Sequence, residues 1–157
     1  MQDRVALRPV TTEDIEIFFV HQLDSEATKL AAFPSRGRDR FFTHWTTNIL
    51  GNPANLSRTI LAGEHVAGYI SAWTDAASND RLICYWTGRE FWGRGIAFAA
   101  LSQFIRVEST RPLSAYVFKH NLGSIRVLEK AGFARIGEHG EEFIYFLAAA
   151  PISEKLL

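Results

Sequence analysis

The chain is short of several features that would point to a particular class of protein. It has one cysteine, Cys84, in 157 residues, so no disulfide can form within it, as is typical of a reducing compartment. No apolar run approaches the ~20 residues of a membrane-spanning helix, and the start, MQDRVALRPV, lacks the apolar core of a signal peptide. We therefore expect a cytoplasmic protein with no membrane partner.

An excess of charge of one sign is also missing. The 17 basic residues are balanced by 17 acidic ones, so nothing in the overall charge points to a nucleic-acid partner. Apolar residues are abundant: 47% of the chain is hydrophobic and 13% is aromatic, well above the content of a disordered chain. We expect one domain over residues 1–157 with its own core, as a monomer or a homodimer.

The pattern of caps, glycines and alternating apolar residues predicts the order of elements. Thr11 and Thr12 offer helix caps, followed by acidic residues that the helix dipole favours. The order is β-α-α-β-β-β-α-β-α-β-β, which predicts an α/β fold with a mixed sheet and helices on both faces. The predicted strands are residues 3–8, 57–62, 65–74, 81–87, 113–118, 133–137 and 141–148, and the later helices end near residues 50, 108 and 131.

Two glycines stand where the strand RLICYWT gives way to a helix, in the segment REFWGRGIAFAAL (residues 89–101). Glycine costs a helix about 0.8–1 kcal/mol relative to alanine, so the pair calls for a reason. The first N–H groups of a helix are unpaired, and glycines let them converge on a phosphate without obstruction. The segment is therefore either an anion site or a tight turn, and the third glycine of a dinucleotide fingerprint is absent because Phe98 stands there.

A second segment, HNLGSIRVLEKAGF (residues 120–133), joins a strand to a helix. Asn121 is a helix-cap residue whose amide can also bind a ligand, and Ser124 lies one turn further on. By itself this segment is equally compatible with an ordinary capped helix that ends at Gly132.

Together the two segments resemble the GNAT superfamily of N-acetyltransferases. EFWGRGIAFAAL resembles its pyrophosphate-binding motif, with Gly93 and Gly95 in the glycine positions and Glu90 where a glutamine or arginine is usual. NLGSIRVLEKAGF, VALRPVTTEDIEIF and ICYWT are similar to the branch that contains the ribosomal-protein N-terminal acetyltransferases. The resemblance spans nearly the whole chain, and residues 25–55 match least. It implies the GNAT fold: a mostly antiparallel sheet with one splayed pair of parallel strands.

The resemblance implies acetyl-CoA as co-substrate, bound between RLICYWT and LSAYVF, with no metal. Backbone groups of Tyr85, Trp86 and Thr87 are expected to pair with the pantetheine arm, and Asn121 to bond its end. The pyrophosphate is expected on the N–H groups of Trp92, Gly93, Arg94, Gly95, Ile96 and Ala97. Ser124 is the expected catalytic residue, which stabilises the sulfur. The implied reaction is direct attack by an amine, so Cys84 is expected to be a small core residue and not a nucleophile.

The general base has no clear candidate. The branch often carries a glutamate where this chain has Leu82 and another where it has Ala99, and the tyrosine acid of many family members is replaced by Leu128. Four substitutes remain open as the base: Tyr116, His120, Glu90 and His21. A weak base favours an acceptor whose amine loses its proton readily, such as a protein N-terminus or a small-molecule amine of low pKa, over a lysine side chain.

The acceptor side is less defined. The loop FPSRGRDR (residues 33–40) is either a binding site for an acidic acceptor or phosphate, or a solvated basic loop. Phe41, Phe42 and Trp45 either line an acceptor pocket or form the core face of a helix. The leading hypothesis is an acetyl-CoA-dependent N-acetyltransferase acting on a primary amine. The alternatives are an antibiotic- or polyamine-type acetyltransferase, a catalytically idle acetyl-CoA-binding sensor, and an interaction domain without a ligand.

Overall fold

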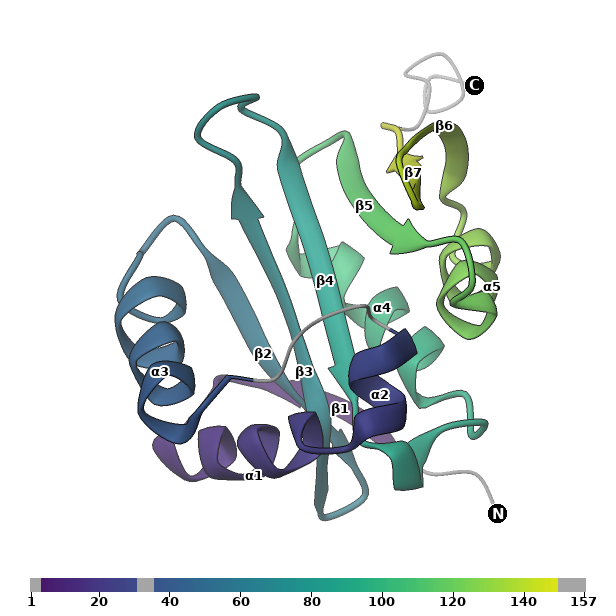
Figure 1. Cartoon of the computed structure of the whole chain (residues 1–157). Helices are drawn as coiled ribbons and strands as arrows, with labels where there is room; N and C mark the ends of the chain where they lie inside the picture. Colours follow the sequence, from purple (N-terminus) through teal and green to yellow (C-terminus); the bar gives the residue numbers. More distant parts are fainter. Residues whose placement is uncertain (1–3, 31–35, 150–157) are drawn as a thin grey trace.

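A seven-stranded sheet forms the centre of the computed structural model, which describes residues 4–30 and 36–149 (Figure 1). The strand order is β1-β2-β3-β4-β5-β7-β6. Every neighbouring pair is antiparallel except β4 and β5, which run parallel. The predicted mixed sheet is confirmed. The strands are β1 (Val5–Arg8), β2 (Leu56–Ala62), β3 (His65–Thr74), β4 (Arg81–Thr87), β5 (Leu113–Phe118), β6 (Ala134–His139) and β7 (Glu142–Leu147).

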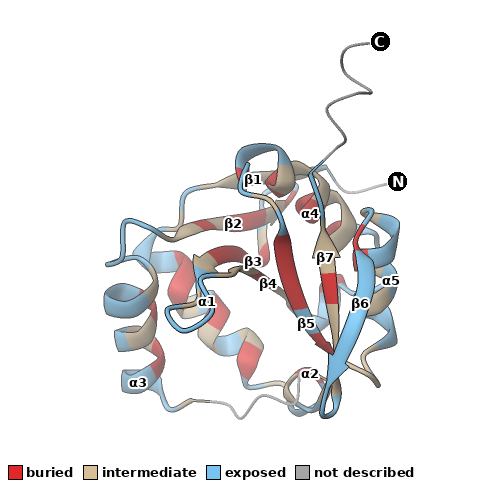
Figure 2. Ribbon diagram, turned by 90° about the horizontal axis from the view of Figure 1, so that it is seen from above, coloured by how far each residue is buried: buried red, intermediate tan, exposed pale blue. Residues whose placement is uncertain are grey.

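The helices cover both faces of the sheet, as predicted. On one face, α4 (Ile96–Val107) and α5 (Leu122–Lys130) bury an apolar cluster that includes Ile70, Leu101 and Phe104. On the other face, α1 (Thr12–Gln22) and α3 (Arg38–Thr43) form a second cluster around Phe18 and Trp45. Figure 2 shows the buried strand β5 inside the sheet and the exposed strand β6 at its edge.

Two segments differ from the sequence-based expectation. A short helix, α2 (Ser25–Leu30), was not predicted. The helix expected from residue 39 to residue 50 changes character halfway, because residues His44–Ile49 form a π-helix, η1, in which the N–H of Leu50 bonds the C=O of Trp45 at 2.9 Å. Such wider turns are rare and often occur at functional sites.

The cap predicted at the start of α1 is part of a buried polar network. The Thr11 side chain accepts from the Asp14 N–H at 3.4 Å, and the Asp14 carboxylate accepts from the Thr11 N–H at 2.9 Å, which completes a capping box. The same carboxylate accepts from Arg8 at 2.6 and 2.9 Å and from the Thr59 hydroxyl at 2.7 Å. Asp14 therefore joins β1, α1 and β2.

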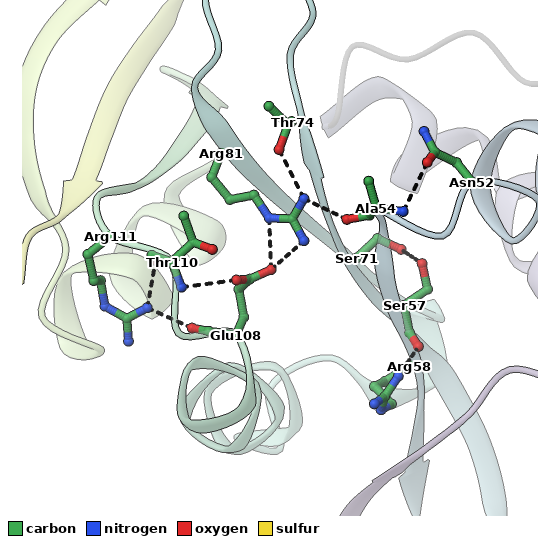
Figure 3. A network of polar contacts seen from close by, with 10 residues as sticks. All are labelled: Asn52, Ala54, Ser57, Arg58, Ser71, Thr74, Arg81, Glu108, Thr110 and Arg111. Carbon is green, nitrogen blue, oxygen red and sulfur yellow. Dashed lines mark hydrogen bonds and ion pairs between the residues drawn. The ribbon is translucent and has the colours of Figure 1, made fainter.

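The parallel strands β4 and β5 are paired only at their first residues and then diverge. Paired residues exist only at Arg81 with Leu113 and at Leu82 with Ser114. At the closed end, the Arg81 guanidinium donates to Glu108 at 2.6 and 2.8 Å and to the Ala54 carbonyl at 2.9 Å (Figure 3). This ion pair is almost fully buried and connects β4 to the end of α4. From residue 83 to residue 87, β4 has no paired residue on β5, so the predicted splay is confirmed.

Candidate acetyl-CoA and acceptor site

A cavity of about 600 Å³ opens between the separated strands and the starts of α4 and α5. Its wall contains every residue expected to bind acetyl-CoA except Arg94. The expected residues on the wall are Tyr85, Trp86, Thr87, Trp92, Gly93, Gly95, Ile96, Ala97, Asn121 and Ser124. The fold thus gathers two sequence segments that lie about 30 residues apart around one space.

The two glycines of the turn have the backbone conformation that the anion-site interpretation requires. Gly93 and Gly95 have φ values of 73° and 74°, a left-handed region that residues with a side chain rarely adopt. Gly95 is the N-cap of α4, and no side chain caps that helix. The first N–H groups of α4 are therefore left to face the cavity at the positive end of the helix dipole.

Two arginines of the glycine turn interact with neighbouring residues of the protein. Arg89 forms an ion pair with Asp24 at 3.5 Å. The Arg94 guanidinium lies 5.3 Å from the centre of the Phe91 ring and donates to the Glu90 carbonyl at 3.2 Å. Arg126 on α5, which the sequence analysis missed, lines the cavity instead. Among the described residues that line the cavity, Arg126 is the one arginine or lysine.

Asn121 caps α5 as predicted. Its side-chain oxygen accepts from the Ser124 N–H at 3.3 Å, which leaves the amide NH₂ group for a ligand. The Ser124 hydroxyl lies 2.8 Å from the Tyr85 hydroxyl, so a serine on α5 and a tyrosine on β4 meet across the cavity. Burial raises the pKa of Tyr85 to about 12, while its hydrogen bond to Ser124 acts in the opposite direction. Both hydroxyls keep their protons near neutral pH.

One backbone group of β4 is already used. The Trp92 indole N–H donates to the Thr87 carbonyl at 3.0 Å. The expectation that Thr87 pairs with the pantetheine arm therefore applies to the rest of its backbone and not to this oxygen.

A second cavity, of about 430 Å³, lies on the face of the sheet covered by α1, α3 and η1. Trp86 lines both cavities and thus marks the place where they adjoin. The aromatic part of the wall consists of Phe18, Phe41, Trp45, Tyr69, Trp73 and Trp86. Phe41 and Trp45 are therefore core residues and cavity residues at once, whereas Phe42 does not line this space.

The titratable groups of the second cavity are few. Among the described residues they are Arg36, His44, Tyr69 and Cys84, with no carboxylate. Burial raises the pKa of the Cys84 thiol to about 12, which keeps it protonated and a poor nucleophile. Cys84 lies on the cavity wall and not within the core, so its expected place was wrong. Burial, and secondarily the charge of Arg36, lower the pKa of His44, which is neutral at pH 7.

None of the four residues considered as a base lines the second cavity. Tyr116 is 46% exposed, and Glu90 lies in the short 3₁₀ turn η2 (Arg89–Phe91). His120 lines the first cavity, and its Nε2 lies 3.2 Å from the Lys29 carbonyl. His21 is half-buried with its ring against Gly88, and this partial burial lowers the pKa of its imidazole.

The basic loop divides between two environments. Phe33 to Ser35 lie outside the described residues. Arg36 reaches the second cavity, and its backbone N–H and C=O are both bonded by the buried Gln22 amide, at 2.9 and 3.0 Å. Arg38 forms an exposed ion pair with Glu16. Arg36 therefore lies on a cavity wall, where its binding of an acceptor or phosphate stays a prediction, and Arg38 follows the solvated interpretation.

Comparison with known proteins agrees with this geometry. A family model described as an acetyltransferase (GNAT) domain matches residues 4–134. The chain belongs to the GNAT acetyltransferase family. Its mixed sheet with one splayed parallel pair, β4–β5, is thus the GNAT fold that the resemblance implied. A sequence search among curated proteins finds no match.

Solved structures share the GNAT fold at low identity. A domain from Methanocaldococcus jannaschii has a TM-score of 0.79 at 16% identity, covering 94% of this chain and 100% of that chain. An acetyltransferase from Thermus thermophilus has a TM-score of 0.78 at 20% identity, covering 95% and 100%. The aminoglycoside acetyltransferase AAC(6')-Ib in complex with coenzyme A has a TM-score of 0.78 at 15% identity, covering 97% and 98%.

Two further findings concern metal-binding groups and membrane-spanning helices among the described residues. No group of three or more histidine, cysteine, aspartate or glutamate side chains in residues 4–30 and 36–149 is arranged to hold a metal ion. Within the same ranges, no helix has both the length and the apolar character needed to cross a bilayer.

Proposed function

We propose that this GNAT protein transfers the acetyl group of acetyl-CoA to a primary amine, of a protein N-terminus or a small molecule, by direct attack. The observation that carries the proposal is the pair of cavities that adjoin at Trp86. The first has an unpaired strand edge and an uncapped helix N-terminus for the coenzyme. The second has room for an acceptor on the opposite face of the sheet.

In this arrangement the first cavity holds acetyl-CoA. The β4 edge from residue 83 to residue 87 pairs with the pantetheine arm, and the N–H groups from Trp92 to Ala97 bind the pyrophosphate. Hydrogen bonds to a charged group contribute about 1.5–3 kcal/mol each, so two or three of them outweigh the cost of both glycines. Arg126 supplies a positive charge for a phosphate, and the Asn121 NH₂ group bonds the pantetheine end.

The chemical step moves one proton overall. The amine nitrogen bonds to the thioester carbon, the carbon–sulfur bond breaks, the nitrogen loses a proton and the thiolate gains one. The Ser124 hydroxyl stabilises the departing sulfur, and the Tyr85 hydroxyl, 2.8 Å from it, positions that group by hydrogen bonding. The pKa of Cys84 at about 12 supports a mechanism without an acyl-enzyme.

The absence of a carboxylate from the described wall of the second cavity favours an acceptor that is readily deprotonated. A chain-terminal α-amine has a pKa of about 7.7–8.0 and a lysine about 10.4, which makes the neutral α-amine about 3.4 kcal/mol more accessible. The same absence argues against an antibiotic- or polyamine-type acceptor, which calls for an acidic pocket. Descent from the ribosomal-protein branch stays a prediction that rests on the motif around Asn121 and Ser124.

The test is an acceptor screen that measures release of the free CoA thiol and identifies the acetylated amine by mass spectrometry. We expect turnover of α-amines, with a higher kcat/KM than matched lysine side chains. Thermal stabilisation by acetyl-CoA without turnover of any amine would contradict the proposal and identify an idle binding module. No stabilisation by CoA at all would identify an interaction domain without this ligand.

A further inference from the structure

The second cavity has a chemistry that selects among amines. Its aromatic walls include a compact triad in which the ring centres of Phe18, Trp45 and Tyr69 lie 4.7–5.1 Å apart. Phe18 of α1 and Trp45 of η1 are almost completely buried, and Tyr69 of β3 packs against the cluster that they form. A wall of this kind gains most from burying an apolar or aromatic group.

The electrostatics of the cavity disfavour a second positive charge. The titratable side chains that face it are Arg36 from the loop before α3, His44 from η1, Tyr69 from β3 and Cys84 from β4. Arg36 is a cation, and the other three are neutral at pH 7. Burial raises the pKa of Tyr69, and the nearby charge of Arg36 offsets only part of that rise. A cation inside this space loses hydration and meets a like charge.

The remaining polar groups are largely used within the protein. Ser57 and Ser71 share a hydrogen bond of 2.8 Å, and Asn55 donates to the carbonyls of Asn48 and Ile49 at 3.2 Å. The Asn48 amide lies 3.2 Å from the Nδ1 of His44. The Tyr69 hydroxyl makes no hydrogen bond to a described residue and is left as a donor for an oxygen of the acceptor.

We propose, given the function proposed above, that the acceptor is a monoamine on an apolar or aromatic body that carries a carbonyl or acidic oxygen and no second cation. The aromatic cavity walls match the apolar body of such a molecule. The Arg36 guanidinium matches an acidic oxygen, and the Tyr69 hydroxyl matches a carbonyl oxygen. The same surroundings destabilise the ammonium form of the amine, and this takes the place of the missing carboxylate base. The amine sheds its proton to solvent as it enters and attacks as the neutral form.

Aromatic walls also allow the opposite selection, because a cation over an aromatic ring gains about 0.5–2 kcal/mol. The two possibilities are separated by phenylalaninamide and lysinamide, which share an α-amine and an amide carbonyl and differ in the side chain. We expect at least tenfold higher kcat/KM for phenylalaninamide. We also expect at least tenfold tighter binding of it to the CoA-loaded protein, measured by tryptophan fluorescence.

A charge placed in the cavity tests the cause. Asn52→Asp adds a carboxylate to the wall and keeps the side-chain oxygen that accepts from the Ala54 N–H at 3.0 Å, and Asn79→Asp adds the same charge in the exposed turn between β3 and β4. Asn52→Asp is expected to move the preference toward lysinamide by about tenfold, and Asn79→Asp to leave it unchanged. An equal shift in both variants would overturn the electrostatic argument.

The outcomes separate this inference from the proposed function. Acetylation of both amides with lysinamide preferred overturns the acceptor class and leaves the acetyltransferase standing. Tight binding of lysinamide would show that the aromatic walls act as a cation site. Selective binding of phenylalaninamide without acetylation of any amine supports the acceptor class and contradicts the proposed reaction.

Discussion

The hydroxyl groups of Tyr85 and Ser124 lie 2.8 Å apart and join β4 to the first turn of α5 across the candidate coenzyme cavity. Either oxygen can donate to the other, so the pair can present one O–H to a departing sulfur. In the proposed mechanism this pair supplies the proton donor, whereas many family members are expected to use a tyrosine at the position of Leu128 on α5.

Replacing Ser124 by alanine is expected to lower kcat by about a hundredfold, the lower end of the range that positioned proton donors contribute. Tyr85→Phe is expected to lower kcat less, because its hydroxyl acts through Ser124. Because the two groups form one unit, the double variant should lose less than the product of the single losses. Steady-state kinetics of the two single variants and the double variant measure these losses, with acetyl-CoA binding as the control. An unchanged kcat in S124A would show that the serine takes no part in the mechanism.

Gly68 holds β3 close to the strand that forms the site. A Cβ atom added to Gly68 would lie 1.8 Å from the carbonyl oxygen of Trp86, and backbone cannot move aside cheaply. Gly68→Ala is expected to destabilise the fold by about 1–3 kcal/mol, or more if β4 cannot shift. Gly37→Ala serves as the control, since its added Cβ meets nothing within 4 Å. Equal denaturation midpoints for the two variants would contradict this account.

The ionisation of the Asp14 carboxyl makes the free energy of unfolding depend on pH. Burial alone raises the pKa of Asp14, but hydrogen bonds from Arg8, Thr11 and Thr59 lower it to about 2 from the 3.8 of an unperturbed carboxyl. A carboxyl whose pKa is lowered by folding stabilises the protein fully above pH 4, and this stabilisation is lost as the pH falls through 2. For Asp14 it amounts to about 2 kcal/mol of the free energy of unfolding.

Asp14→Asn is therefore expected to lower the free energy of unfolding at pH 7 and to flatten its decline between about pH 4 and pH 2. Glu64→Gln removes the same charge from the exposed β2–β3 turn and should leave that decline intact. Urea denaturation across this range measures both, and parallel curves for D14N and the unaltered protein would count against the network.

Much of the fold follows from local signals in the sequence. The threonine cap, the alternation in β3 and β4, and the glycines before α4 each act within a few residues, and the corresponding elements lie where they were expected. The helix α2 has six residues and one buried side chain, Ala27, so it carries no apolar stripe to indicate it. The π-helix η1 looks like an ordinary helix in sequence, since its special feature is a shift in hydrogen bonding.

The candidate site was predictable only where contiguous motifs form it. The candidate coenzyme cavity is built around two such segments, and the family resemblance indicated both. The second cavity collects single residues from α1, α3, η1, β2, β3 and β4, such as Phe18, His44 and Cys84, whose meeting depends on the tertiary fold. Arg126 and the partnership of Tyr85 with Ser124 likewise depend on how α5 packs against β4.

Calorimetric titration with coenzyme A tests the central claim, that N–H groups bared by Gly93 and Gly95 hold the diphosphate. In the test variant Gly93 and Gly95 are both changed to valine. In the control variant Gly63 and Gly140 are both changed to valine. These two also have positive φ values, of 62° and 59°, but lie in turns away from the cavity, so the backbone strain is matched. We predict at least a hundredfold weaker binding in the first variant and native affinity in the second; native affinity in both would contradict the account.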